Sequence, residues 1–111
     1  LLAHGIHVVD VDYDRVAAAG ATNIHNPESN ANNGVGRLDI PRAAGRGCAI
    51  GIGTDGMSSA VLRAQRAAFL GLRGGSEDPT LGYRDVPRLL ATNARVAGRF
   101  LDEPALGQLA P

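Results

Sequence analysis

The sequence predicts an α/β fold in which parallel strands alternate with helices. Three short apolar runs, residues 1–4, 21–25 and 47–53, are each followed by a segment with helical features. Strands and helices that alternate in this way are joined by crossover connections, and the strands therefore lie parallel. Two architectures fit this order: consecutive units of an eight-stranded barrel, or part of an open doubly wound sheet.

The composition is that of one globular domain. The chain has 111 residues, of which 44% are hydrophobic and 20% charged, which is room for one domain of ordinary composition. Eleven basic residues balance eleven acidic ones, so no net charge attracts nucleic acid or an anionic membrane. A single cysteine, Cys48, excludes an intrachain disulfide, and no apolar run is long enough to span a bilayer. We therefore expect a cytoplasmic protein.

The first half of the chain carries one predicted helix, one predicted loop and a weaker helical stretch. Asp10, Asp12 or Asp14 is expected to cap the helix that follows the first strand. Residues 26–36 are rich in asparagine and glycine, which predicts a long loop. A weak helical pattern follows at residues 40–44.

Two amphipathic helices are predicted in the second half. The first is expected to be capped by Ser58 or Ser59 and carries apolar residues at helical spacing, namely Val61, Ala64, Ala68 and Leu72. The second spans Asp85 to Phe100. The tail from Leu101 is expected to be irregular.

Three polar residues stand at or just after the ends of the three predicted strands. His4 and His25 end the first two strands, and Asp55 follows the third. Because the carboxyl ends of parallel strands meet at one rim, we expect these side chains to lie close together. Imidazole and carboxylate groups at such a rim favour a divalent metal ion with a bound water molecule.

The segment Gly51–Gly56 allows a different function. It has the pattern GxGxxG between a strand and a helix, as in dinucleotide-binding proteins. Asp55, however, would place a carboxylate where the backbone should receive a pyrophosphate. A nucleotide-binding α/β module therefore remains the alternative to a metal-dependent enzyme.

Three stretches resemble the last third of the catalytic barrel of the amidohydrolase superfamily. They are LAHG at residues 2–5, HNPESNANN at residues 25–33 and GIGTDGMSS at residues 51–59. Within the superfamily they are similar to the cytosine deaminase and chlorohydrolase branch, and most of all to the SsnA-type aminohydrolases. The similarity extends to residues 91–97 and 106–111.

The resemblance implies a partial TIM (β/α)8 barrel, with residues 1–111 forming its C-terminal portion, about strands 6 to 8 with their helices. It implies catalytic roles for His4 and Asp55, with Asp55 also a ligand of a divalent metal, zinc or alternatively iron. His25 and Asn30 would bind the substrate. The implied reaction is hydrolysis of a carbon–nitrogen bond, most simply the deamination of an amino-substituted heterocycle.

The family's remaining metal ligands and its catalytic glutamate have no counterpart here and are expected before Leu1. The chain would then be a fragment of a longer protein, and the resemblance is compatible with a homo-oligomeric parent protein. Three strands do not close a barrel, so Leu1, Ala3, Ile50 and Ile52 are expected to lack partners. We therefore expect the isolated chain to be aggregation-prone, to bind metal weakly and to be inactive.

Overall fold

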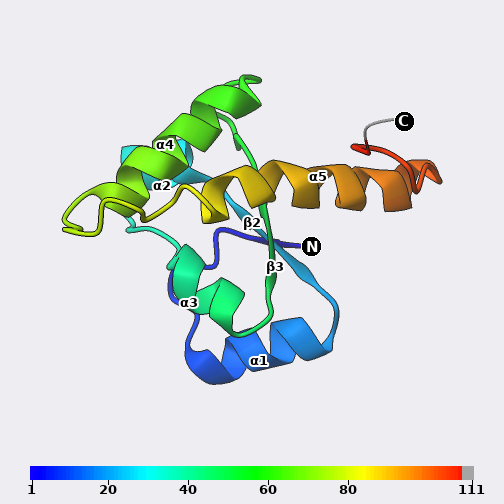
Figure 1. Cartoon of the computed structure of the whole chain (residues 1–111), viewed down its shortest axis with the longest axis horizontal. Helices are drawn as coiled ribbons and strands as arrows, with labels where there is room; N and C mark the ends of the chain where they lie inside the picture. The colour runs from blue at the N-terminus through cyan, green and yellow to red at the C-terminus, as the bar shows by residue number, and fades with distance from the viewer. Residues whose placement is uncertain (109–111) are drawn as a thin grey trace.

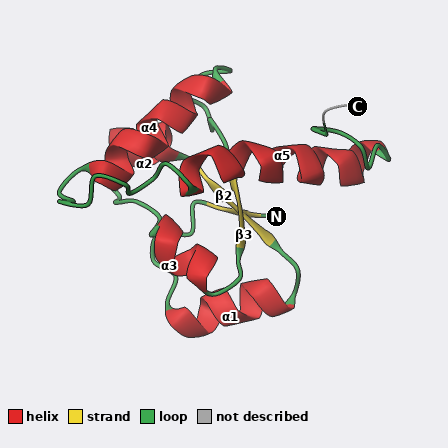
Figure 2. Cartoon of the chain, in the orientation of Figure 1, coloured by secondary structure: helices red, strands yellow, loops and turns green. Residues whose placement is uncertain are grey.

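A computed structural model describes residues 1–108, in which three strands and five helices follow one another along the chain (Figures 1 and 2). In chain order the elements are β1 (Leu2–Ala3), α1 (Asp10–Ala18), β2 (Thr22–His25), α2 (Pro27–Asn32), α3 (Ile40–Gly45), β3 (Ala49–Ile52), α4 (Val61–Arg73) and α5 (Asp85–Leu101).

The three strands form one parallel sheet in the order β1-β2-β3. Ala3 pairs with Ile24 and Ile24 with Gly51, while His25 pairs with Ile52. The predicted α/β fold with parallel strands is therefore confirmed. Sequential order is compatible with consecutive strands of a barrel, but a barrel needs eight strands to close.

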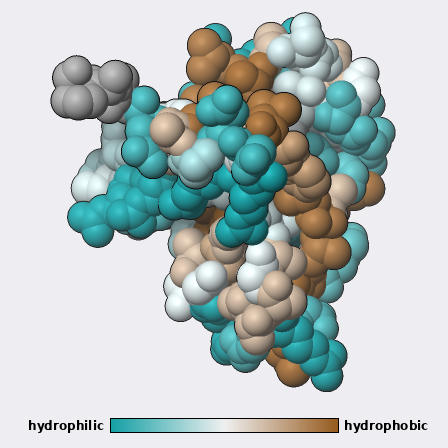
Figure 3. Space-filling view, turned by 90° about the vertical axis from the view of Figure 1, so that its right-hand side faces the viewer, coloured by the Kyte–Doolittle hydropathy of each residue, from teal (hydrophilic) through white to brown (hydrophobic). Residues whose placement is uncertain are grey.

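The hydrophobic core lies between the sheet and its helices. It consists of Tyr13, Leu38, Ile40, Ala43, Cys48, Ile50, Ile52, Ala64, Ala68, Leu72, Val86 and Leu89. The prediction that Ile50 and Ile52 lack partners is wrong, because side chains of α3, α4 and α5 join them in this core. Leu1 and Ala3 are exposed, as predicted. The side of the molecule that carries the end of α5 shows apolar patches among polar ones (Figure 3).

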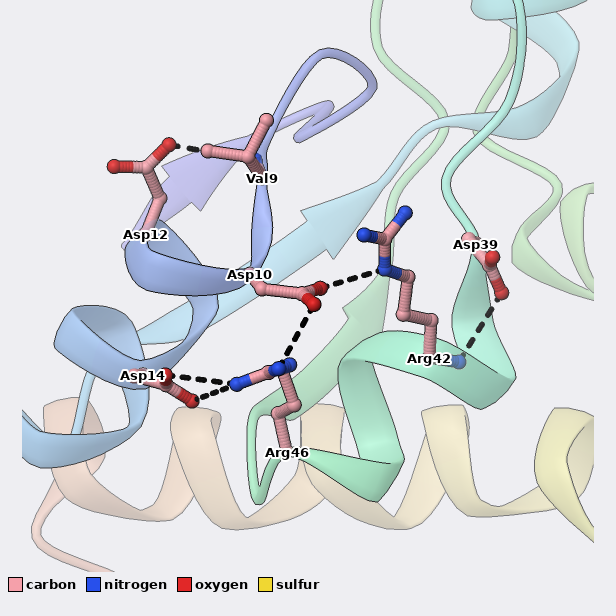
Figure 4. A network of polar contacts seen from close by, with 7 residues as sticks. All are labelled: Val9, Asp10, Asp12, Asp14, Asp39, Arg42 and Arg46. Atoms are coloured by element: carbon pink, nitrogen blue, oxygen red, sulfur yellow. Dashed lines mark hydrogen bonds and ion pairs between the residues drawn. The ribbon is translucent and has the colours of Figure 1, made fainter.

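Helices α1 and α3 are joined by a network of charged side chains (Figure 4). Arg46 lies 2.6 Å from Asp14 and 2.8 Å from Asp10, and the Nε of Arg42 lies 2.7 Å from Asp10. The hydrogen bond from Arg42 holds the pKa of Asp10 below its ordinary value. The network connects the two helices that precede β2 and β3.

The N-terminus of α1 differs from the prediction. Its N-cap is Val9, not an aspartate. Asp12 still serves this helix end, because its Oδ2 accepts a hydrogen bond from the backbone N–H of Val9 at 3.3 Å. Asp10 and Asp14 bind arginines instead, which the local sequence could not indicate because those arginines are more than 30 residues away.

Residues 27–32, predicted as part of a loop, form helix α2 instead. Pro27 stands in its first turn, where a fixed φ angle suits a helix, and Glu28 suits the positive end of the helix dipole. The buried side chains include the polar residues Ser29 and Asn30. A helix of six residues with a polar buried face has no hydrophobic periodicity, which is why the sequence pattern indicated a loop.

The other helices follow the predictions more closely. The weak pattern at residues 40–44 becomes α3, which Asp39 caps by accepting a hydrogen bond from the N–H of Arg42. Helix α4 starts after Ala60 rather than after a serine, and Ser58 accepts a hydrogen bond from the N–H of Ala60. Helix α5 agrees with its predicted bounds within one residue.

The chain beyond α5 has no further helix or strand up to residue 108, as predicted. The rest of the similar segment 106–111 lies outside the described residues. In the described chain, no helix combines the length and apolar character needed to cross a membrane.

Gly51 in β3 and Gly53 directly after it make room for neighbouring side chains. A methyl group at Gly51 would lie 2.8 Å from Cδ1 of Ile24 and 2.5 Å from the side-chain oxygen of Asn93. A methyl group at Gly53 would lie 2.8 Å from Cγ2 of Ile24 and would also collide with Asn26. Close packing against β2 and α5 therefore accounts for both glycines.

We predict that Gly53→Ala lowers the free energy of unfolding by about 1–3 kcal/mol, because the added methyl group overpacks the contact with Ile24. Gly56→Ala is the matched control, since no atom lies within 4 Å of its added methyl group. Urea denaturation of the two variants measures the difference, and equal stabilities would contradict this packing.

Candidate active site

His4 and Asp55 lie side by side, although β2 separates their strands in the sheet. His4 directly follows β1, and Asp55 lies in the turn after β3. The Nε2 atom of His4 is 3.8 Å from Oδ2 of Asp55, and the two side chains are 40% and 43% exposed. The structure thus brings together two of the three predicted strand-end residues, and a small molecule can reach both.

Both residues adopt a backbone conformation that side chains disfavour. His4 has a φ angle of 67° and Asp55 a φ angle of 50°. Within residues 1–108 the one other non-glycine residue with positive φ is Asp102, which ends α5. A left-handed residue in a turn persists where its surroundings hold it, and such residues cluster at functional sites. The backbone therefore marks the same two residues as the sequence motifs.

Helix α2 supplies the side chains that hold this pair. The hydroxyl of Ser29 donates a hydrogen bond to Oδ2 of Asp55 at 2.6 Å. The Oδ1 atom of Asn30 lies 2.7 Å from Nδ1 of His4. Both α2 side chains are buried. The sequence predicted a substrate contact for Asn30 and no catalytic role for Ser29, because it did not predict the helix that directs both side chains toward the strand ends.

The hydrogen bond from Ser29 is the main reason that the pKa of Asp55 lies below its ordinary value. The backbone N–H of Gly56 lowers this pKa further, burial acts in the opposite direction, and the nearby His4 contributes a smaller lowering. Asp55 is therefore ionised at neutral pH. An ionised, accessible carboxylate beside an imidazole can bind a cation or exchange a proton with a bound molecule.

His25 does not join the predicted rim. His25 pairs with Ile52, so its side chain lies on the same face of the sheet as that core residue. His25 is 3% exposed. Its Nδ1 atom is buried and has no hydrogen-bond partner within the described chain. His25 lines a cavity of about 400 Å³ between α2 and α4, together with Asn30, Arg37 and Leu72. His25 therefore lies near His4 but does not form one metal-binding group with His4 and Asp55 within residues 1–108.

The residues present supply part of a metal site. Within residues 1–108 no group of three or more histidine, cysteine, aspartate or glutamate side chains could hold a metal ion. His4 and Asp55 offer two suitable donors, an imidazole nitrogen and a carboxylate oxygen. Zinc sites in proteins use three or four protein ligands. The pair therefore fits one side of a divalent metal site, and further ligands would have to come from elsewhere.

The segment Gly51–Gly56 does not have the features of a phosphate-binding loop. Its first two glycines are packed against side chains, and α4 begins five residues after Gly56. Asn93 of α5 accepts a hydrogen bond from the N–H of Ile52 at 2.8 Å and donates one to its carbonyl oxygen at 2.7 Å. Sequence analysis missed this contact, which fixes the end of β3 just before Asp55. These features disfavour the nucleotide-binding alternative.

Comparison with known proteins identifies relatives of this chain. The profile of the amidohydrolase family matches residues 1–81. The 5-methylthioadenosine/S-adenosylhomocysteine deaminase of Nitratidesulfovibrio vulgaris is 34% identical over 99% of this chain and 26% of its own length. The 8-oxoguanine deaminase of Pseudomonas aeruginosa is 34% identical over 99% of this chain and 25% of its own length.

A third relative, the 5-methylthioadenosine/S-adenosylhomocysteine deaminase of Pyrococcus abyssi, is 32% identical over 87% of this chain and 24% of its own length. The chain thus spans about a quarter of the length of these relatives. No solved structure matches it.

We predict that His25 makes stability depend on pH. Burial, followed by the nearby His4, lowers the pKa of His25 to about 4 from its ordinary value of 6.5. Between these values the unfolded chain binds a proton that the folded chain does not. Stability should therefore fall as the pH drops from 6.5 to 4, by up to about 3 kcal/mol from this group.

Urea denaturation at several pH values measures this effect. His25→Gln should flatten the profile in this window, whereas His7→Gln, which changes an exposed histidine, should retain it. A wild-type profile that His25→Gln leaves unchanged would show that His25 is not buried in its neutral form.

Proposed function

Because the chain belongs to the amidohydrolase family, we propose that it contributes His4 and Asp55 to the active site of a hydrolase that cleaves carbon–nitrogen bonds. The observation that carries this proposal is the 3.8 Å approach of the two side chains, each on a left-handed backbone position. The same two residues lie in the motifs that resemble the family. Geometry and sequence therefore select one pair independently.

The proposed reaction is the hydrolytic deamination of an amino-substituted heterocycle. The relatives that match nearly the whole chain are named as deaminases, which supports this class. In such a reaction the oxygen of water adds to the ring carbon that bears the amine, and ammonia leaves. One group must accept the proton of the water and return a proton to the departing amine.

Asp55 is suited to the proton transfer, because it is ionised, accessible and held on one oxygen by Ser29. It takes the proton from the attacking water and passes it to the leaving amine. His4, beside it, stabilises the charge that develops during the addition. A divalent metal ion, zinc or iron, would lower the pKa of a water molecule bound to it. Asp55 would be the metal ligand that this chain provides.

We further propose that β1, β2 and β3 correspond to strands 6 to 8 of a TIM barrel. The sequential parallel order of the strands supports this correspondence. The match to the deaminases, which covers about a quarter of each relative's length, supports it as well. The remaining metal ligands and a proton donor for the ring would then lie outside these residues. On this proposal the chain binds metal weakly and shows no turnover when it stands alone.

The substrate roles of His25 and Asn30 are also part of the proposal. Both residues line the cavity between α2 and α4, and Asn30 contacts His4 as well. We propose that this cavity receives the part of the substrate that does not react. His25→Ala should then raise KM more than it lowers kcat.

A chimeric enzyme tests the catalytic assignment. We predict that this chain, substituted for the matching quarter of the Nitratidesulfovibrio vulgaris deaminase, supports deamination. Asp55→Asn in that chimera should lower kcat by about 10²–10⁴-fold, because the amide cannot accept the proton. Ultraviolet absorbance of the heterocycle follows the reaction.

Asp102→Asn is the matched control. It makes the same change at a residue with a φ angle of 55°, close to the 50° of Asp55, but at the end of α5. This control should retain activity. A folded, monodisperse chimera that is inactive, or one in which Asp55→Asn is fully active, would refute the proposal.

A further inference from the structure

The two ring nitrogens of His4 have different neighbours. Nδ1 lies 2.7 Å from the side-chain oxygen of Asn30, whereas Nε2 lies 3.8 Å from Oδ2 of Asp55. A third group, Nδ2 of Asn26, lies 3.5 Å from Nδ1. This is at the outer limit of a hydrogen bond, so Asn30 is the partner that determines the state of Nδ1.

We propose that Asn30 is a positioning residue that holds the proton of neutral His4 on Nδ1. An amide oxygen can only accept a hydrogen bond, so the nitrogen 2.7 Å away must donate one. A neutral imidazole carries one N–H, and Nε2 is then left with a lone pair on the side of Asp55. The inference deepens the proposed function and depends on it for its catalytic meaning.

The surroundings of Asn30 make it a firm support. Its side chain is 1% exposed, in the middle of α2. Glu28 on the same helix accepts a hydrogen bond from Arg63 at 2.5 Å, which ties α2 to α4. The contact between Oδ1 of Asn30 and Nδ1 of His4 orients the amide, because the buried Nδ2 of Asn30 has no hydrogen-bond partner within residues 1–108.

Ser29, which precedes Asn30 in α2, makes a comparable contact with Asp55. Asn33 donates to the hydroxyl oxygen of Ser29 at 3.4 Å, and the hydroxyl hydrogen of Ser29 points to Oδ2 of Asp55. Ser29 thus binds Oδ2 of Asp55, while the backbone N–H of Gly56 also donates to the carboxylate. Two consecutive residues of one helix therefore each bind one atom of a reacting side chain, Nδ1 of His4 and Oδ2 of Asp55.

This arrangement defines how His4 acts. With a lone pair on Nε2, His4 can accept a hydrogen bond or a proton on the side where Asp55 and the substrate lie. Once protonated, it still donates from Nδ1 to Asn30 and can donate from Nε2 to the developing charge. Asn30 therefore keeps Nε2 of neutral His4 available to accept a hydrogen bond or a proton, in addition to its proposed contact with the substrate.

Nitrogen-15 NMR of the histidine rings tests the inference directly in the 111-residue chain. Under mildly alkaline conditions, which keep imidazoles neutral, long-range spectra distinguish a protonated from an unprotonated ring nitrogen. His4→Gln assigns the signals. We expect a protonated Nδ1 and an unprotonated Nε2 for His4 in the wild type.

The variants separate a specific role from a structural one. Asn30→Leu should move both nitrogen signals toward averaged values, and Asn30→Asp, which restores an acceptor oxygen, should restore the Nδ1–H form. Asn32→Leu, at an exposed position of the same helix, is the matched control and should leave the spectrum unchanged.

A wild-type His4 with its proton on Nε2 would overturn the inference, even if Asn30→Leu failed to fold. An Asn30→Leu variant that keeps the wild-type signals would overturn it as well. The spectra require neither metal nor substrate, so they stand apart from the chimera's activity. An inactive chimera with the expected tautomer would refute the proposed function and leave the contact established.

Discussion

The hydrogen bonds that leave helix α2 are the interactions on which the site depends. His4 and Asp55 follow strands that are not neighbours, and each occupies a left-handed backbone position. Helix α2 follows β2, the strand that lies between them. Its buried Asn30 contacts His4 on one side, and its buried Ser29 contacts Asp55 on the other. These two contacts, at 2.7 and 2.6 Å, are shorter than the 3.5 Å approach of Asn26 to His4, so α2 provides the main side-chain support of the pair.

The rest of the fold keeps the strand ends and α2 in place. Gly51 and Gly53, in and just after β3, let Ile24 pack closely against the chain there. Asn93 of α5 binds the backbone of Ile52 just before the turn to Asp55. The result is a buried polar support beneath two half-exposed reacting groups. This division suits an enzyme, because the support fixes the geometry while the exposed atoms remain free for a ligand.

Local sequence signals predicted the order of strands and helices and placed His4 and Asp55 near strand ends. They could not predict α2, because its buried face is polar and too short to show a period. They also misplaced His25. The direction of its side chain depends on the register with Ile52, which a single strand does not reveal. The role of Asn93 was not predicted either, because its partner Ile52 is 41 residues away in the sequence.

The contact between Ser29 and Asp55 tests the central claim most directly, because it joins α2 to the end of β3. The pKa of Asp55 can be measured from its side-chain carbon signal in an NMR titration of the wild type and of Ser29→Ala. The account predicts that the pKa rises toward its ordinary value in Ser29→Ala, because the hydroxyl no longer stabilises the ionised carboxylate. Ser58→Ala, in the turn before α4, should leave it unchanged. An Asp55 pKa that is the same in the wild type and in Ser29→Ala would contradict the claim that α2 builds this site.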